Sequence, residues 1–471
     1  MMLLSPHIPH GNGICHSSSS NSSTSSSDTK SVNAHLHCQN NLGSISSPPP
    51  YSPASCLDFG RCVASCVAYG RVCPLTAQTA GRAASRKMES IVENSPLFGG
   101  LPPSFPKTAP PEDLILGEKL GEGGFCTVHA CTMRNEPLDE SCAVKFLRRE
   151  ITAVRQNFEH GAADLATEAF FLARLQHPNI VRLRAVAAGS VESNIVSGRE
   201  TGFFLVVDRL VETLGHRIRR WKQQTEEMPH NLFHRMSKEY KDKQKALLKE
   251  RLQVAVQIAE VCSYLHGLNV AYRDLKPDNI GFDRDGTLKL FDFGLCKEEK
   301  QTIAFEGKYR MTGHTGSRRY MAPEVAKNQP YDKSVDVYSF GVLLWELCSL
   351  EKPFSAYCSK KHMTQVILGG ERPKMDHAHT AFWPVALQTM LCKCWSSHPE
   401  DRPSFDAIKA TLEEVMTELS MVHNERTRAR SIGSKEDDSK KSPTSPGIKI
   451  HPLSNFGGLR ARSLGLKRSQ S

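Results

Sequence analysis

The chain has 471 residues, of which 39% are apolar, 23% charged and 7% aromatic. This length suits one large domain with tails or several ordinary domains, and the apolar share lies below the globular average. No apolar run approaches the ~18 residues of a membrane-spanning helix, so the sequence predicts no membrane span. Collagen, coiled-coil and small disulfide-scaffold compositions are excluded as well.

The two ends of the chain carry its formal charge of +10. Residues 1–88 carry +4 and residues 424–471 carry +7, which leaves residues 89–423 close to neutral at −1. Basic ends are typical of appendages that meet anions, or of solvated tails with no fixed partner. They lack interleaved aromatic residues for base stacking, so we expect no nucleic-acid partner.

Fifteen cysteines are distributed along the chain, and nine of them lie between residues 113 and 420. An odd number beside mostly apolar neighbours is typical of reduced thiols and not of a disulfide framework. We therefore expect a cytoplasmic protein. The Ser-rich, acid-poor stretch that runs to Arg86 is also typical of an organelle transit peptide, which stays open as an alternative.

Residues 1–112 are expected to form a disordered Ser/Pro-rich region. Nine of the eleven residues 17–27 are Ser, and prolines at 48–50 and 102–103 interrupt any regular pattern. Such a segment cannot bury enough apolar surface to offset the entropy of ordering. Residues 421–471 are basic and also lose apolar periodicity, which predicts a disordered C-terminal tail.

Residues 113–420 are predicted to form one α+β domain with two lobes, because strand patterns come first and helical patterns follow. One apolar helix face covers residues 247–262, and a more fully apolar helix covers 335–347. Two insertions, 148–165 and 219–250, lengthen the connections; the second is either a solvated helix or a docking surface. The predicted strands are residues 114–120, 128–132, 142–147 and 203–207.

Three features in the first half of this domain point to phosphate binding. The Gly-rich stretch LGEGGFCTV at residues 120–128 predicts a hairpin that lets backbone N–H groups approach phosphate, although alone it is an ordinary β-turn. Lys145 lies on an apolar strand and needs a counter-charge if it points inward. Glu168, on a predicted helix, is a candidate partner; alone, it is a solvent-exposed carboxylate.

The stretch YRDLKPDN at residues 272–279 is the most specific motif. Asp274 is placed to accept a hydroxyl proton, Lys276 to neutralise a transferring phosphoryl group, and Asn279 to bind a metal ion. Asp292 begins an Asp-Phe-Gly turn thirteen residues after Asn279, and its carboxylate is a hard ligand suited to Mg²⁺. The set predicts phosphoryl transfer.

Three later residues are expected to support this set. Glu324, in an Ala-Pro-Glu turn, and Arg402 are predicted to form a buried ion pair with a structural role. Asp336 stands at the start of an apolar helix. It is expected either to cap that helix or to brace the loop at residues 272–274.

These motifs, in this order and spacing, resemble those of the eukaryotic protein kinase family. The resemblance covers residues 113–420, about two thirds of the chain. The strings DVYSFG at 336–341, WE at 345–346 and RPSF at 402–405 resemble the tyrosine-kinase-like group of serine/threonine kinases. The resemblance implies a bilobal protein kinase fold and a phosphotransferase that uses ATP and Mg²⁺.

The resemblance also implies a role for each matching residue. Asp274, Lys276, Lys145 and Glu168 would be catalytic, and Asn279 and Asp292 would hold Mg²⁺. Val207 falls at the gatekeeper position of the adenine site. The residues implied to contact ATP are Leu120, Gly121, Glu122, Gly123, Gly124, Val128, Ala143, Lys145, Val207, Asp208 and Leu210.

Three positions depart from the family pattern. Cys126 replaces the third glycine of the loop and is expected to stiffen it or to expose a thiol to oxidation. Tyr272 stands where the family usually has His. Gly281 stands where an apolar residue normally packs under the adenine, which leaves the affinity for ATP open.

The residues around Asp274 also indicate the acceptor. Asp274-Leu-Lys-Pro resembles the serine/threonine pattern, and Ser317 matches the position where such kinases place Ser or Thr near that Asp. We therefore expect protein Ser or Thr substrates. In this family, the arginine at the position of Arg273 often binds a phosphate on the activation segment. An upstream kinase is therefore an expected partner. The candidate phosphate acceptors within the segment 292–324 are Thr302, Tyr309, Thr312 and Thr315.

The alternative is a kinase-fold scaffold that acts by binding partners and does not catalyse. The complete set of expected catalytic and metal-binding residues argues against it: Lys145, Glu168, Asp274, Asn279 and Asp292 are all in place.

Overall fold

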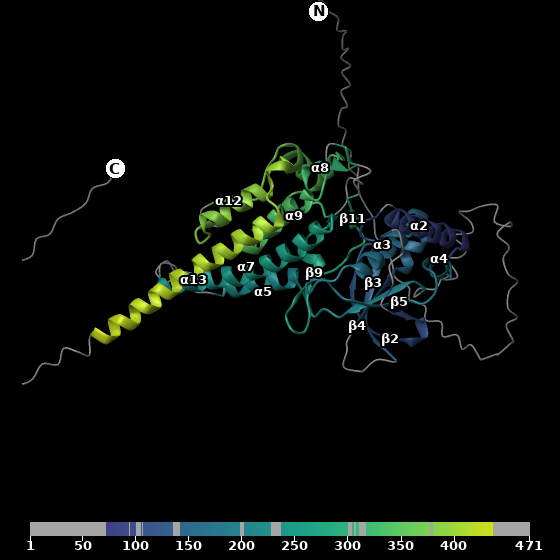
Figure 1. Cartoon of the computed structure of the whole chain (residues 1–471), viewed down its shortest axis with the longest axis horizontal. Coiled ribbons are helices and arrows are strands. Elements are labelled where there is room, and N and C mark those ends of the chain that lie inside the picture. The colour runs from purple at the N-terminus through teal and green to yellow at the C-terminus, as the bar shows by residue number, and fades with distance from the viewer. Residues whose placement is uncertain are drawn as a thin grey trace, which may run out of the picture. The chain divides into compact units, whose positions relative to one another are not determined.

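The computed structural model describes residues 72–93, 95–99, 105, 107–134, 142–197, 202–227, 237–299, 304–305, 308–309, 317–376 and 380–436, with the backbone alone at 304–305, at 308–309 and from 421 onward. All of them belong to one compact unit, Pro53–Ser471. A lobe built on a β-sheet is followed along the chain by a mainly helical lobe (Figure 1), which confirms the predicted two-lobed α+β fold.

The N-terminal lobe is built on a six-stranded sheet with strand order β1-β5-β6-β4-β3-β2. β1 runs parallel to β5, and the other neighbours are antiparallel. Val144 and Phe146 are buried on one face of β4, as expected for alternate residues of a strand. The strands are β1 (Thr108–Ala109), β2 (Leu114–Glu122), β3 (Cys126–Met133), β4 (Cys142–Leu147), β5 (Leu183–Ala187) and β6 (Phe204–Asp208).

Helix α3 (Arg155–Arg174) contacts this sheet at β4 and β5 and carries Glu168. A short 3₁₀ turn, Arg149–Ala153, leads into it. The stretch 148–165, which was predicted to be an insertion, is therefore mostly the first half of α3. Phe158, Leu165 and Phe171 are buried on the helix, which fixes its position in the lobe.

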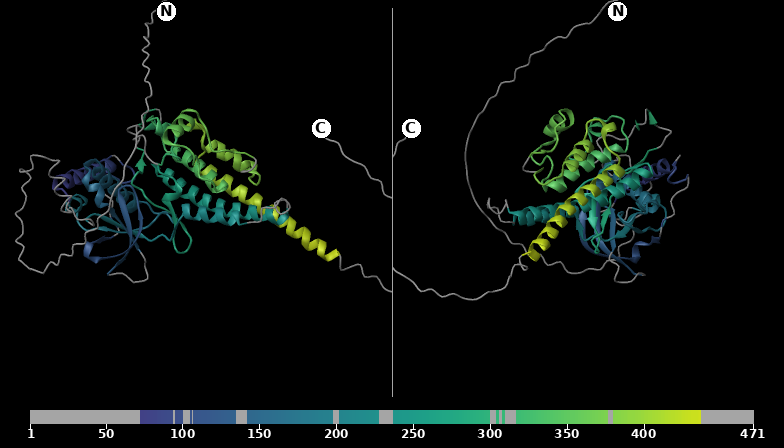
Figure 2. Two further views of the ribbon diagram at one scale, coloured as in Figure 1. Left: turned by 180° about the vertical axis from the view of Figure 1, so that it is seen from behind. Right: turned by 60° about the vertical axis from the view of Figure 1, so that its left-hand side comes forward.

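Residues 74–92 form helix α2 (Pro74–Val92), so the disorder predicted for residues 1–112 does not hold there. Pro74 opens the helix, where its missing N–H removes no hydrogen bond. Small residues recur every three or four positions and are buried. This narrow face lets α2 lie against α3 and the short helix α4 (Val191–Val196) (Figures 1 and 2). The buried residues of α2 are Thr76, Ala77, Ala80, Gly81 and Ala84.

The C-terminal lobe is mainly helical (Figure 2). α7 packs against α9 and α13, and α12 also packs against α9 and α13. α9 is buried along nearly its whole length, as the apolar run at 335–347 predicts. The helices are α5 (Leu214–Glu226), α7 (Lys238–Gly267), α8 (Pro323–Ala326), α9 (Ser334–Ser349), α10 (Ser359–Lys361), α12 (Val385–Cys394) and α13 (Phe405–Glu436). A π-helical turn, His362–Leu368, follows α10.

Two segments are more regular than the sequence predicted. The first turns of α7 bury Tyr240, Gln244 and Leu248, so this part of the 219–250 insertion packs on one face and is not a fully solvated helix. α13 continues to Glu436, so the disorder predicted for residues 421–471 does not hold for 421–436. Once a helix is anchored by packing, each further residue adds one hydrogen bond without a new nucleation cost, so the helix extends readily.

Short strands bring the loops of the predicted site together. β9 (Ile280–Phe282) pairs with β10 (Leu288–Leu290) and β7 (Glu212–Thr213), and β11 (Lys297–Glu298) pairs with β8 (Val270–Ala271). β12 (Ala304–Phe305) pairs with β13 (Lys308–Tyr309). In the part of the chain that the structure describes, no helix is long and apolar enough to cross a membrane.

Candidate active site

Lys145 and two carboxylates form a closely spaced group between β4 and α3. Lys145 Nζ donates to Glu168 Oε2 at 2.6 Å and to Asp292 Oδ1 at 2.9 Å. Burial opposes the charge on Lys145, but Asp292 and Glu168 outweigh it and hold the pKa of the ammonium well above its usual value. The same ammonium lowers the pKa of Asp292. The predicted contact between Lys145 and Glu168 is therefore present, and Lys145 is a fixed cation.

Asp336 of α9 holds the loop at residues 272–279. Its Oδ2 accepts the N–H of Tyr272 at 2.8 Å, and its Oδ1 accepts the N–H of Arg273 at 2.7 Å. Arg273 and Asp292 have positive φ values of 72° and 66°. Such strain persists in residues with a side chain only where the surroundings fix the backbone. Asp336 was expected either to cap its helix or to brace the loop at residues 272–274, and the structure shows the second.

Asp274 is oriented through both of its carboxylate oxygens. Oδ1 accepts the backbone N–H of Ser317 at 2.8 Å. Oδ2 accepts Lys276 Nζ at 2.5 Å and Asn279 Nδ2 at 2.9 Å. The side chain of Asp274 is only 8% exposed. A carboxylate fixed in this way, with a cation beside it, suits proton acceptance from a hydroxyl group during transfer of an anionic group.

Asn279 and Asp292 offer oxygen atoms that suit a magnesium ion. Asn279 Nδ2 donates to the backbone oxygen of Asp274 at 3.0 Å as well as to Oδ2, so the amide nitrogen is engaged and the amide oxygen remains for another partner. Asp292 uses Oδ1 for Lys145, and its side chain is 42% exposed. An amide oxygen and a carboxylate are hard ligands, so this donor set fits Mg²⁺, which would neutralise phosphate charge there.

The Gly-rich turn between β2 and β3 is tied to the end of β4. Gly123 N–H donates to Cys126 O at 2.8 Å and closes the turn. Arg148 donates to Glu122 Oε1 at 2.7 Å and to Gly123 O at 3.1 Å. Of the residues expected to contact ATP, Leu120, Gly121 and Glu122 lie on β2, Gly123 and Gly124 in the turn, Val128 on β3, Ala143 and Lys145 on β4, Val207 and Asp208 on β6, and Leu210 just beyond β6.

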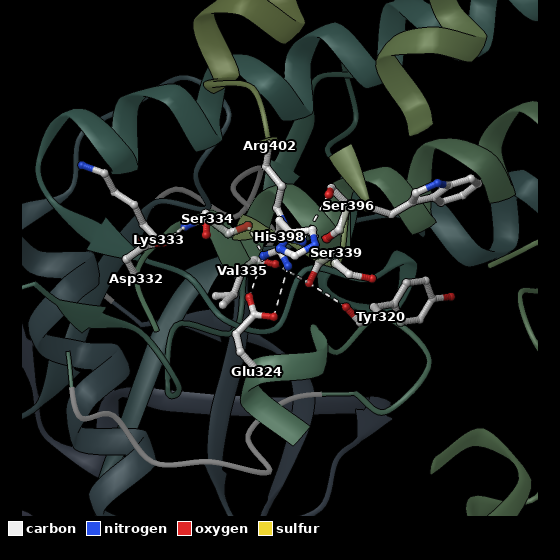
Figure 3. Close-up of polar contacts among 12 residues, drawn as sticks. Tyr320, Glu324, Asp332, Lys333, Ser334, Val335, Ser339, Ser396, His398 and Arg402 are labelled. Atoms are coloured by element: carbon white, nitrogen blue, oxygen red, sulfur yellow. Dashed lines mark hydrogen bonds and ion pairs between the residues drawn. The ribbon is translucent and has the colours of Figure 1, made fainter. Parts of the chain in front are cut away.

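Glu324 and Arg402 form the predicted buried ion pair (Figure 3). Arg402 donates from Nη1 to Glu324 Oε1 at 2.6 Å and from Nη2 to Glu324 Oε2 at 3.1 Å. Its remaining donors reach the backbone oxygens of Ser334 and Ser396. Nearby, Ser339 Oγ donates to the backbone oxygen of Tyr320 at 2.8 Å. These contacts anchor the chain that leads from Ser317 into the C-terminal lobe.

Sequence reasoning missed three of the contacts around the site. Ser317 was chosen for its side-chain type, yet its backbone N–H is what contacts Asp274. Arg148 was assigned to an insertion, yet it holds the Gly-rich turn. His266 Nε2 lies 3.1 Å from Asp336 Oδ2. No local motif marks these contacts, because they join segments that are distant in sequence.

A family model described as "Protein tyrosine and serine/threonine kinase" matches residues 114–412. The match covers well over half of the chain. The chain belongs to the protein kinase family.

Curated relatives of this kinase include proteins from a plant and an amoeba. Serine/threonine/tyrosine-protein kinase HT1 of Arabidopsis thaliana is 30% identical over 65% of this chain and 67% of its own length. Serine/threonine-protein kinase STY46 of the same plant is 27% identical, over 71% of this chain and 47% of its own. Dual specificity protein kinase shkB of Dictyostelium discoideum is 28% identical, over 62% and 38%. The matches thus span less than half of the last two relatives. Such relatives are typical of the tyrosine-kinase-like group.

Two departures of this kinase from the family pattern now have a structural setting. Burial raises the pKa of Cys126 to about 12, against the pull of Lys145, so the thiol stays protonated and the expected sensitivity to oxidation is not supported. A Cβ added at Gly281 would lie 2.6 Å from Leu210 Cδ1. Leu210 therefore occupies the space beside Gly281 that a side chain at this position would need.

The third departure, Tyr272, links the loop at residues 272–279 to the Asp-Phe-Gly turn. Its hydroxyl donates to the backbone oxygen of Phe291 at 2.5 Å, and its ring meets Phe293 edge-on with centroids 5.3 Å apart. Tyr272 is buried and so acts as a wedge between the two segments. Among the expected phosphate acceptors, Tyr309 ends β13, whereas Thr302, Thr312 and Thr315 lie outside the described residues.

Proposed function

We propose that this chain is a serine/threonine protein kinase that transfers the γ-phosphate of ATP to protein Ser or Thr hydroxyls in intracellular signalling. The geometry of Asp274 carries the proposal. Its carboxylate accepts hydrogen bonds from Ser317, Lys276 and Asn279. These bonds hold it in one orientation, as a general base requires. A scaffold without catalysis has no need of this arrangement.

The proposed nucleotide site follows from the same geometry. Lys145 would hold the α- and β-phosphates, because it is a partly buried cation already oriented by Glu168. Asn279 and Asp292 would bind Mg²⁺. The adenine would lie beside Ala143, Val128 and the gatekeeper Val207, with backbone contacts from Asp208 to Leu210. The phosphates would be covered by the Gly-rich turn at 120–124.

Lys276 supports Ser and Thr as acceptors, because it lies next to the proposed base in the string that resembles the serine/threonine pattern. The names of HT1 and shkB include tyrosine or dual specificity, so phosphotyrosine is the competing product. An upstream kinase that modifies the activation segment is a further proposed partner. Buried free thiols such as Cys262, Cys296 and Cys348 support a reducing compartment, and we propose the cytoplasm.

The test compares purified full-length protein with its Asp274→Ala variant in labelled ATP, Mg²⁺ and a mixed protein substrate. Mass spectrometry then identifies the modified residues. Phosphoserine and phosphothreonine from the wild type alone would support the proposal. Phosphotyrosine at a similar rate would reassign the acceptor class, and equal labelling by the two proteins would exclude Asp274 as the base.

A further inference from the structure

Helix α2 lies outside the residues that match the kinase family, yet it packs on the kinase domain. It lies close to α4, where a Cβ added at Gly81 would be 3.0 Å from Val196 Cγ2. Ala80 and Ala84, with no exposed surface, lie on the same buried face. Helices approach this closely only where the facing side chains are small. The contact is thus a fitted helix interface.

α3, the main partner of α2, touches three parts of the proposed active site along one face. Glu168 binds Lys145. One turn earlier, the backbone oxygen of Asp164 lies 3.1 Å from where a Cβ would stand on Gly294, in the Asp-Phe-Gly turn. Another turn earlier, Gly161 lies under the Gly-rich turn, since its added Cβ would be 2.9 Å from Phe125 Cβ. Any displacement of α3 therefore reaches all three parts.

Polar side chains of α2 interact with this helix at two points. Arg86 of α2 helps to lower the pKa of Glu159, after Arg155, whose guanidinium binds that carboxylate directly. Burial raises the pKa of Asp164 to about 6, and Lys87 of α2 is the cation that opposes this most. α2 thus supplies charge as well as packing to the helix that carries Glu168.

The residues after α2 reach the base of the activation segment. The Ser95 hydroxyl donates to Glu298 Oε2, and Leu97 N–H donates to Glu298 Oε1 at 2.9 Å. Ser95 Oγ also accepts the N–H of Phe98 at 3.0 Å. Ser95 and Glu298 are only 4% and 5% exposed. Glu298 lies on β11, which pairs with β8 directly before the catalytic loop, so this carboxylate links the N-terminal segment to that loop.

Phe98 then closes the connection back to α3. Its ring lies 5.9 Å from the rings of both Phe170 and Phe171, centroid to centroid. Arg174 donates to the backbone oxygen of Phe98 at 3.2 Å and places its guanidinium over the same ring. Only 1% of the surface of Phe98 is exposed, so its side chain is part of the core and fixes the N-terminal segment to α3.

We propose that α2 together with residues 95–98 is a positioning element of the kinase, which holds α3 and the base of the activation segment in the arrangement that aligns Lys145, Glu168 and Asp292. α2 fixes α3 from one side, and the Ser95–Glu298 contact fixes β11 relative to it. Helix and loop shifts of this kind are two-state changes in packed proteins, so a contact present in one state raises its population. The proposal rests on the proposed kinase activity for its consequence, but its structural part does not.

The first experiment tests the Ser95–Glu298 contact in the full-length chain. Ser95→Asp places a second carboxylate against Glu298, and we expect kcat to fall about tenfold as the aligned state is depopulated. Ser95→Asp with Glu298→Gln removes the repulsion and is expected to recover most of kcat. The rate of hydrogen–deuterium exchange in peptides from α3 and β11 should rise in the single variant. It should return to the wild-type rate in the double variant. Loss of kcat without recovery, or unchanged exchange, would overturn the proposal.

The second experiment detaches α2 itself. Ala80→Arg puts a long cation into the buried face, whereas Arg82→Gln on the exposed face is the matched control. We expect faster exchange in α3 and about tenfold lower kcat for Ala80→Arg alone, with exchange in α9 and α12 unchanged because the C-terminal lobe stays folded. Released α2 with normal α3 exchange and normal kcat would contradict the proposal. If the wild type transfers no phosphate, the exchange data still test whether α2 stabilises α3.

Discussion

The backbone N–H of Ser317 donates to Oδ1 of Asp274 at 2.8 Å. The far end of the activation segment is thereby joined directly to the proposed catalytic base, forty-three residues earlier in the chain. Because the donor is a backbone group, side-chain identity at position 317 does not decide the contact. The hydrogen bond therefore holds this part of the activation segment beside the proposed base.

Asp274→Asn keeps the size of the side chain and removes its basicity. We expect kcat to fall by about 10³-fold, within the range that general-base catalysis contributes. Binding of ATP with Mg²⁺ should persist, because Asn279 and Asp292 are unchanged. Phosphate transfer and nucleotide binding by calorimetry check the two statements separately. A variant that keeps a tenth of the wild-type kcat would show that another group accepts the proton.

Glu168→Gln removes the charge that orients Lys145 and leaves the shape of α3 nearly intact. Lys145 still has Asp292 as a partner, so we expect it to shift toward that carboxylate and away from the phosphates. A misplacement of this kind costs about 10²-fold in kcat/KM for ATP. Steady-state kinetics with varied ATP measure it. Glu414→Gln, on an exposed position of α13, is the matched control and should behave as wild type.

Leu210 and Gly281 share one space at the adenine end of the proposed site. Gly281→Leu would force Leu210 to move and would also crowd the backbone oxygen of Glu212, 3.2 Å from the added Cβ. We expect KM for ATP to rise by about tenfold, because overpacking costs about 1–3 kcal/mol and about 1.4 kcal/mol corresponds to a tenfold change in affinity. Leu210→Ala added to this variant should lower KM again. Lack of any recovery would mean that the two side chains do not compete.

Sequence motifs predicted the parts of the site that consist of short strings. Asp274, Asn279 and Asp292 come together because two loops of fixed length follow short paired strands. Local geometry of this kind can be predicted from the sequence. Arg148 and His266 were not found, because their partners are distant in sequence and no spacing connects them.

The N-terminal helix shows why composition misled at residues 74–92. The stretch is poor in large apolar residues, which is typical of disorder. Yet Ala77, Ala80, Gly81 and Ala84 recur with helical spacing, and a face of small residues serves close helix packing. The signal was present as periodicity, and it was hidden because small residues count little in an average of hydrophobicity.

Arg402→Ala is expected to destabilise the kinase strongly. Arg402 has a fully buried side chain and bonds Glu324 through two nitrogens, so its removal leaves an unpaired buried carboxylate. Breaking such a pair costs about 3–5 kcal/mol of unfolding free energy. Denaturant unfolding measures it. Lys409→Ala removes the more exposed pair with Glu260 and should cost less than about 1 kcal/mol. Similar losses for the two variants would contradict the structural role of the buried pair.

Glu346 should make the kinase less stable as pH rises. Burial raises the pKa of Glu346 to about 7 from its usual 4.5, although the Tyr320 hydroxyl, which donates to Oε2 at 2.6 Å, favours the charged form. Between pH 4.5 and 7 the folded protein keeps a proton that the unfolded chain has lost, so unfolding releases a proton and stability falls through this window. For a pKa shift of this size, the free energy of unfolding falls by about 3 kcal/mol from the lower to the upper end of this pH window.

Glu346→Gln tests this because it keeps the acceptor for Tyr320 and cannot ionise. We expect the variant to match the wild type near pH 4.5 and to be more stable at pH 8, with a flatter dependence between. Glu299 acts in the same direction, since burial raises its pKa to about 7 as well, so part of the slope should remain. Urea unfolding at pH 5, 6, 7 and 8 supplies the four free energies. An unchanged slope in the variant would mean that Glu346 ionises normally in the folded kinase.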